Sequence, residues 1–161
     1  MDSKVTATPL ISEGEQMQAL VRYTRDEITA FASLTGDANP LHHDRQAAER
    51  ASFGEIIASG QQTASRMMGL VASHFSRSDD GVPREMLCLN FNFAFKSPVF
   101  AEQDIRIVWR VSEIERSTSR GGFIGHVDGT ASVAGKACVV GRGTVLVRRP
   151  SSVKAAAAAS R

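Results

Sequence analysis

The residues best suited to chemistry lie together in the stretch 36–42, which reads GDANPLH. Asp37 and His42 stand five positions apart, with an Asn-Pro step between them. Pro40 fixes its own φ angle and biases Asn39 towards extended geometry, which stiffens the loop. A carboxylate and an imidazole on a rigid loop can share one water molecule, one accepting its proton and the other orienting it. The spacing therefore points to general acid–base chemistry at Asp37 and His42.

The same composition is also typical of a plain turn. Asp and Asn side chains bond nearby backbone groups, and Asn-Pro initiates turns, so the residues alone leave both interpretations open. A metal site on the adjacent His-His pair is a further option, but no other His or Cys stands at ligand spacing, and no metal is expected. His74 and His126 are isolated in the sequence. Cys88 and Cys138 lie in apolar segments without CxxC spacing, which predicts structural thiols.

Helices on both sides must position this loop. Thr24 and Glu27 form a capping-box pattern, apolar residues then recur at helical spacing, and Gly36 stops the run. These signals predict a helix over about 25–35. A short helix over 45–51 follows the loop. Beyond Gly60, apolar residues fall on one helical face for about four turns, which predicts the longest helix of the chain.

The second half of the chain has strand periodicity instead. Four strands are predicted, over about 87–95, 105–111, 123–134 and 137–147, the last two joined by a Gly135-Lys136 turn. Helices followed by consecutive strands are typical of an α+β fold, not of a parallel sheet. We therefore expect one long helix packed on a curled antiparallel sheet.

Length and composition set the class of protein. A chain of 161 residues with 42% hydrophobic and 22% charged residues is expected to form one soluble globular domain. We place this domain at 15–150, between a loose lead-in over 1–14 and an Ala-rich, disordered tail over 151–161. No apolar stretch has the length of a signal peptide or membrane span, so the sequence predicts a cytoplasmic protein without membrane contact.

The charge distribution argues against a nucleic-acid partner. Five of the 19 Lys and Arg residues lie after position 141, whereas no Asp or Glu follows Asp128. The first 141 residues therefore carry 14 basic against 17 acidic residues, and the body of the protein is weakly acidic. The high pI comes from unopposed cations near the C-terminus rather than from a basic face.

Residues 23–44, from Tyr23 to Asp44, resemble the MaoC-like hydratases, the R-specific enoyl-CoA hydratase family, whose hallmark is a Gly-Asp-x-Asn-Pro-x-His loop. Every specified position of that loop is present here, and the likeness extends over about 20–150, including the strand around 89–100. The resemblance implies the hot-dog fold, a long helix wrapped by an antiparallel sheet. This agrees with the α+β architecture expected from periodicity.

The resemblance further implies reversible syn hydration of a trans-2-enoyl thioester of CoA or acyl-carrier protein to an R-3-hydroxyacyl thioester, with no metal or redox cofactor. Asp37 would accept the water proton while His42 holds the water and helps protonate C2. An enolate forms on the thioester oxygen, and the backbone N–H of Gly60 at a helix start is our candidate donor. A non-catalytic acyl-thioester-binding module or partner subunit is the alternative, because fold does not fix function. Thioesterase activity is a weaker third.

This sequence departs from the family before the long helix. Many relatives have His-Gly there, whereas this chain has Ser59-Gly60, so the role of that His is lost or passed to Ser59. Gln61, Gln62 and Arg66 could meet a polar acyl chain, or form a solvated helix face. Apolar side chains could line an acyl tunnel or pack in the core: Phe91, Phe93, Phe95, Met67 and Met68. An uncovered sheet edge also predicts a homodimer with the site near its interface.

Overall fold

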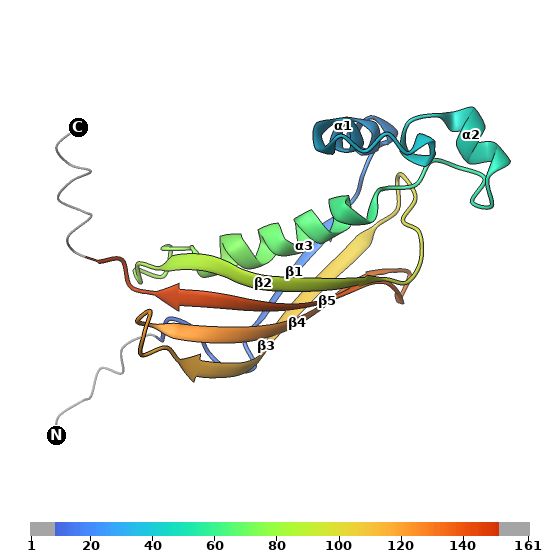
Figure 1. Ribbon diagram of the computed structural model, residues 1–161. Helices are drawn as coiled ribbons and strands as arrows, with labels where there is room; N and C mark the ends of the chain where they lie inside the picture. Colours follow the sequence, from blue (N-terminus) through green and yellow to red (C-terminus); the bar gives the residue numbers. More distant parts are fainter. Residues whose placement is uncertain (1–8, 152–161) are drawn as a thin grey trace, which may run out of the picture.

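A long helix lies against one face of a five-stranded antiparallel sheet in the computed structural model, which describes residues 9–151 (Figure 1). The helix is α3 (Gly60–Phe75). The strands are β1 (Gln16–Val21), β2 (Glu85–Phe95), β3 (Ile105–Arg116), β4 (Phe123–Val133) and β5 (Lys136–Arg148), in the order β1-β3-β4-β5-β2. The expected α+β architecture is confirmed, and β2 is an edge strand.

The connection between β1 and α3 carries the candidate loop. It contains α1 (Arg25–Thr35), a 3₁₀ turn η1 (Pro40–His42) and α2 (Arg45–Arg50), which lie beyond the start of α3 at one end of the molecule (Figure 1). The predicted capping box is present, since the Glu27 N–H donates to Thr24 Oγ1 at 3.1 Å and the Thr24 N–H to Glu27 Oε2 at 2.8 Å. These caps fix where α1 begins, and hence where the loop after it starts.

Strand β1 is absent from the sequence prediction. It pairs with β3 from Gln16 opposite Arg110 to Val21 opposite Ile105. The alternation of apolar and polar residues in β1 is weak, because the outward-facing Leu20 is apolar although it is 70% exposed. A strand with two Gln residues and an exposed Leu gains its stability from pairing with β3 rather than from its own pattern.

Two further differences concern the chain ends and one turn. Leu10 and Ile11 fall within the expected lead-in, yet both are buried in the core; residues 152–161 of the expected tail lie outside the described residues. The β4–β5 turn is centred on Ala134 and Gly135, both with positive φ, one position earlier than predicted. Two consecutive left-handed residues match the right-handed twist of a hairpin.

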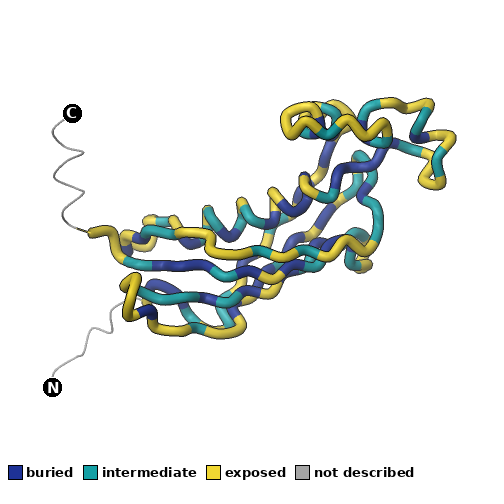
Figure 2. The backbone as a smooth tube through the Cα atoms, viewed as in Figure 1, coloured by how far each residue is buried: buried dark blue, intermediate teal, exposed yellow. Residues whose placement is uncertain are grey.

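The core lies between α3 and the inward face of the sheet (Figure 2). Trp109 of β3 is fully buried and donates its Nε1–H to the Met67 carbonyl of α3 at 3.0 Å. A Cβ atom at Gly129 would lie 2.2 Å from the Trp109 ring, and one at Gly141 2.8 Å from it. Glycine is therefore required beneath this ring, which sets the distance between α3 and the sheet.

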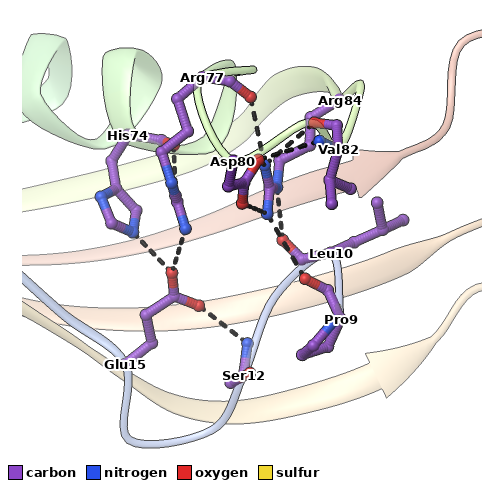
Figure 3. Close-up of polar contacts among 9 residues, drawn as sticks. All are labelled: Pro9, Leu10, Ser12, Glu15, His74, Arg77, Asp80, Val82 and Arg84. Atoms are coloured by element: carbon purple, nitrogen blue, oxygen red, sulfur yellow. Dashed lines mark hydrogen bonds and ion pairs between the residues drawn. The ribbon is translucent and has the colours of Figure 1, made fainter. Parts of the chain in front are cut away.

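A polar cluster ties the far end of α3 to the N-terminal segment (Figure 3). The Arg84 side chain is 1% exposed and donates to both Asp80 carboxylate oxygens and to the carbonyls of Leu10 and Val82. The Arg84 guanidinium also holds the pKa of the Asp80 carboxyl well below its usual range. A buried guanidinium with this many acceptors fixes the chain before β1 against the segment before β2.

Glu15 forms the other half of this cluster. His74 Nε2 lies 2.7 Å from Glu15 Oε1, and Arg77 donates to the same oxygen at 3.0 Å. Burial raises the pKa of the Glu15 carboxyl, but hydrogen bonds from His74, the Ser12 N–H and Arg77 outweigh burial and leave the pKa below its ordinary value. His74 therefore has a structural partner at the opposite end of α3 from the candidate loop.

Candidate active site

The loop after α1 is rigid because its side chains bond its own backbone. Gly36 ends α1 with φ of 72°, a left-handed conformation that glycine adopts without strain. The Asn39 N–H donates to Asp37 Oδ1 at 3.0 Å, and Asn39 Oδ1 accepts from the Leu41 N–H at 3.1 Å. Pro40 is the first residue of η1. Asn39 thus bonds the loop on both sides of itself, with one oxygen of Asp37 engaged and the other turned elsewhere.

His42 is oriented by a backbone group from a different segment. Its Nδ1 lies 2.6 Å from the carbonyl oxygen of Ile57, and the Ile57 N–H donates to the Leu41 carbonyl at 3.2 Å. Because a carbonyl can only accept, Nδ1 must carry the hydrogen. In the neutral imidazole Nε2 is then an unprotonated hydrogen-bond acceptor. The His42 residue is buried, with 6% of its surface exposed.

The structure brings Asp37 and His42 together. His42 Nε2 lies 3.5 Å from Asp37 Oδ2, and the two side chains are 7% and 18% exposed. Two acceptors at this separation can each take one hydrogen of a single water molecule. Gln61 Nε2 donates to the same Asp37 oxygen at 3.3 Å, so the carboxylate is held from the α3 side as well.

The start of α3 adds donors beside this pair. Ser59 is the N-cap residue but makes no side-chain cap hydrogen bond, and the first bond of the helix runs from the Gln62 N–H to the Ser59 carbonyl at 3.1 Å. The Gly60 N–H precedes that bond and points out of the helix end, where the helix dipole is positive. A Cβ atom on Gly60 would lie 2.6 Å from the Phe95 ring. Glycine at position 60 therefore lets the Phe95 ring lie against the start of α3.

A cavity of about 590 Å³ joins the loop to the start of α3. Its lining includes Asp37, His42, Ser59, Gly60 and Phe95. Ser59 is 4% exposed, and its Oγ has no hydrogen-bond partner within the described residues. A buried hydroxyl without a hydrogen-bond partner costs free energy, and a ligand in the cavity that bonds to it would remove that cost.

The other polar candidates separate in space. Gln61 lines the cavity and contacts Asp37, but Gln62 and Arg66 line a smaller pocket of about 230 Å³ beside Tyr23. Neither Gln62 nor Arg66 is among the residues that line the Asp37 cavity, so the lining does not support their contact with an acyl chain there. The sequence predicts for Gln61 either a substrate contact or a solvated helix face, and neither interpretation includes its hydrogen bond to Asp37.

Of the apolar residues considered for an acyl tunnel, only Phe95 lines the cavity. Phe91 and Phe93 pack their rings against Trp109, with centroids 5.7 and 6.4 Å away, and Met67 is fully buried. Core packing is thus their role. Further lining comes from residues that the sequence analysis did not single out for the site: Phe53, Ile57, Lys96, Ser97, Pro98, Val99 and Val139.

The remaining His and Cys residues do not assemble a metal site within residues 9–151. No group of three or more His, Cys, Asp or Glu side chains there could hold a metal ion, and no helix in that range is long and apolar enough to cross a bilayer. His126 pairs with Glu115 at 2.9 Å. Cys88 and Cys138 are free thiols, one exposed and one buried.

Comparison with known proteins places the chain in a family. A family model described as the MaoC like domain matches residues 7–133, more than three quarters of the chain. The chain belongs to the MaoC-like domain family. The Asp37–His42 loop and the start of α3 both lie inside the matched region.

Sequence relatives of this MaoC-like protein include named hydro-lyases. A mitochondrial 3-hydroxyacyl-[acyl-carrier-protein] dehydratase of Solanum lycopersicum is 26% identical over 103 residues, covering 64% of this chain and 58% of the relative. The (R)-specific enoyl-CoA hydratase of Aeromonas caviae is 29% identical over 92 residues, covering 57% and 64%. The alignments therefore span only about three fifths of the length of these relatives.

Solved structures confirm the hot-dog fold. The (R)-hydratase from A. caviae involved in PHA biosynthesis superposes with a TM-score of 0.73 at 24% identity, covering 87% of this chain and 98% of that one. A subunit of the HadBC (3R-hydroxyacyl-ACP dehydratase) complex from Mycobacterium tuberculosis gives 0.67 at 15% identity, covering 84% and 96%. These structural similarities show the fold of the chain and nothing further.

Proposed function

We propose that this MaoC-like protein catalyses the reversible hydration of a trans-2-enoyl thioester to an R-3-hydroxyacyl thioester. The observation that carries the proposal is the pair formed by His42 Nε2 and Asp37 Oδ2, 3.5 Å apart at the edge of the cavity. Both relatives named above carry out, by name, hydration or dehydration of this substrate class. A fixed Nδ1–H on His42 leaves Nε2 free to accept, as a water-holding group must.

The proposed reaction is a proton-balanced addition. Asp37 takes one proton from a water molecule that also donates a hydrogen bond to His42 Nε2. The hydroxide forms the C3–O bond, and the electrons of the C2=C3 double bond move onto the thioester oxygen as an enolate. C2 then takes a proton from the Asp37–His42 pair, which returns to its starting state. Delivery of both groups from one side of the substrate gives syn addition.

The start of α3 is proposed to stabilise the enolate. The Gly60 N–H lies at the positive end of a 16-residue helix, and the partnerless Ser59 hydroxyl can rotate to donate beside it. This assigns to Ser59 part of the task of the His that many relatives carry. No metal or redox group takes part in this scheme.

The protein is further proposed to act as a homodimer. The edge strand β2 carries three large apolar side chains that are exposed in the single chain, Leu87 at 46%, Leu89 at 36% and Phe95 at 58%. Pairing of β2 with a second copy would cover this edge and complete the cavity wall beside Phe95. Light scattering on purified protein tests the stoichiometry.

The cytoplasmic location predicted from sequence stays a prediction, since the tomato relative is named as mitochondrial.

The alternative is an acyl-thioester-binding module without activity, or the partner subunit of a heteromeric enzyme. The two proposals differ in turnover. We expect purified protein to hydrate a trans-2-enoyl-CoA to the R product, and D37N to lose at least about 99% of that rate while still folding. An Asp-to-Asn change keeps the shape and the acceptor for the Asn39 N–H. Tight binding of the thioester without turnover by the wild type would favour the module, and full activity of D37N would remove Asp37 from the mechanism.

A further inference from the structure

A second cavity, of about 440 Å³, lies where β5 ends and is lined by arginines. Arg148 is the last residue of β5, Arg149 follows it, and Arg120 comes from the turn between β3 and β4. Among residues 9–151, no Asp or Glu lines this cavity. It lies at the opposite end of the sheet from α1 and α2, as the ribbon shows (Figure 1). We call it the arginine cavity.

The arginine cavity is built on an ordered turn. Gly122 has φ of 78°, and a Cβ there would lie 2.5 Å from the Val147 carbonyl oxygen and from the Arg148 side chain. Only glycine therefore lets the turn lie this close to β5. The Arg120 N–H donates to Ser117 Oγ at 3.2 Å, and an Arg148 Nη1–H donates to the Arg120 carbonyl at 3.1 Å.

The three arginines differ in how their charge is compensated. Arg148 donates to Glu85 at 2.6 Å, which neutralises it and ties it to the first residue of β2. Arg120 and Arg149 are exposed, and within residues 9–151 their guanidinium groups have neither an ion pair nor a hydrogen bond. Two uncompensated guanidinium groups around a concave site are suited to phosphate, which they can bind through two parallel hydrogen bonds.

In a two-fold symmetric dimer that pairs through β2, the arginine cavity of one subunit would lie beside the active site of the other subunit. Strand β2 runs from Glu85, bonded to Arg148, to Phe95, which lines the Asp37–His42 cavity. Two identical edge strands related by a two-fold axis pair antiparallel, so the start of one β2 lies beside the end of the other. In such a dimer each arginine cavity lies beside the partner's acyl site rather than beside its own.

We propose that Arg120 and Arg149 of one subunit bind the phosphate groups of the CoA thioester whose acyl group occupies the Asp37–His42 site of the other subunit. This inference rests on the proposed function and on the β2 dimer. CoA carries its phosphates at the far end of the pantetheine arm, away from the thioester. Such a ligand requires an anion site removed from the reacting carbons, and the described part of this cavity's lining contains no acidic residue.

The kinetic test uses the double variant R120A/R149A and two substrates. For an enoyl-CoA we expect KM to rise about tenfold with kcat unchanged. For the enoyl-pantetheine thioester, which lacks the phosphates, KM should not move. The control is Arg106→Ala, which removes an exposed arginine of β3 near the opposite sheet edge and should leave both substrates unaffected. An unchanged KM for the CoA ester, an equal rise with both substrates, or an effect confined to an acyl-carrier-protein thioester would overturn the inference.

Mixed dimers test which subunit supplies the arginines. A D37N subunit is co-expressed with an R120A/R149A subunit under a second tag, and the mixed dimer is isolated on both tags. Its only intact Asp37 belongs to the arginine variant and would face the intact arginines of the D37N subunit. A wild-type KM for enoyl-CoA supports binding across the interface, and a raised KM contradicts it.

A binding measurement separates this inference from the proposed function. Adenosine 3′,5′-bisphosphate is titrated into the wild type and into R120A/R149A by calorimetry, which needs no turnover. Binding that is lost in the variant supports the phosphate site even if the wild type fails to hydrate enoyl-CoA, a failure that would refute the proposed function alone. Absent binding, or binding that does not depend on these arginines, overturns the inference.

Discussion

Replacing Ser59 by Ala is expected to raise stability and lower activity. Ser59 makes no side-chain cap hydrogen bond, so its removal sacrifices no capping interaction. Its Oγ is buried without a partner in the described part of the chain, and leaving a hydroxyl in that state costs about 1–3 kcal/mol. S59A should therefore increase the free energy of unfolding by about 1 kcal/mol. If the hydroxyl assists Gly60 at the enolate, kcat/KM should fall about tenfold or more.

Both effects can be read from the same preparations. Urea unfolding is followed by the fluorescence of Trp109, the only tryptophan and a fully buried one, and hydration by the loss of enoyl-thioester absorbance. The matched control is Ser76→Ala at the other end of α3, where Oγ donates to the Ala72 carbonyl at 2.7 Å. S76A should lower stability slightly and leave the rate unchanged. A clear loss of stability in S59A would mean that its hydroxyl is hydrogen-bonded, and an unchanged rate would exclude Ser59 from the oxyanion site.

Two further predictions concern the polar cluster at the far end of α3. Arg84→Met should lower the free energy of unfolding by about 1–3 kcal/mol, because it leaves the buried Leu10 and Val82 carbonyls without their side-chain donor; an unchanged urea midpoint would contradict this. Glu15 has a folded-state pKa below its ordinary value of 4.5, so its contribution to stability is complete above that pH and is lost as pH falls through the folded pKa. Glu15→Gln should therefore flatten the acid limb of the stability curve, and an unchanged limb would show that the bonds from His74 and Arg77 do not favour the charged carboxylate.

The features that the sequence predicts well are those that depend on interactions between residues a few positions apart. The Thr24–Glu27 capping box and the stop at Gly36 set α1 to within a residue, because both signals act over one helical turn. The Asn-Pro step likewise identifies the rigid loop, since Asn39 bonds groups only two positions away. Such local hydrogen bonds need no knowledge of the tertiary structure.

The features that sequence misses depend on contacts between distant segments. The carbonyl of Ile57 orients His42 across 15 positions, and a backbone carbonyl has no side-chain signature. Gln61 reaches Asp37 across 24 positions because α3 starts beside the loop. Residues Gln16–Val21 form a strand only through pairing with β3. In each case the partner is supplied by the fold, so periodicity and motif spacing cannot reveal it.

The central claim is that Asp37 and His42 act as one unit on one water molecule, and a double-mutant cycle measures this directly. Steady-state hydration of an enoyl-CoA is compared for the wild type, D37N, His42→Gln and the double variant, each checked for an intact unfolding transition. Groups that act together lose their joint effect when either is removed. We expect each single change to lower kcat about a hundredfold or more and the double variant to be no slower than the worse single one. Losses that multiply in the double variant, or a single variant with near wild-type kcat, would contradict the shared-water mechanism.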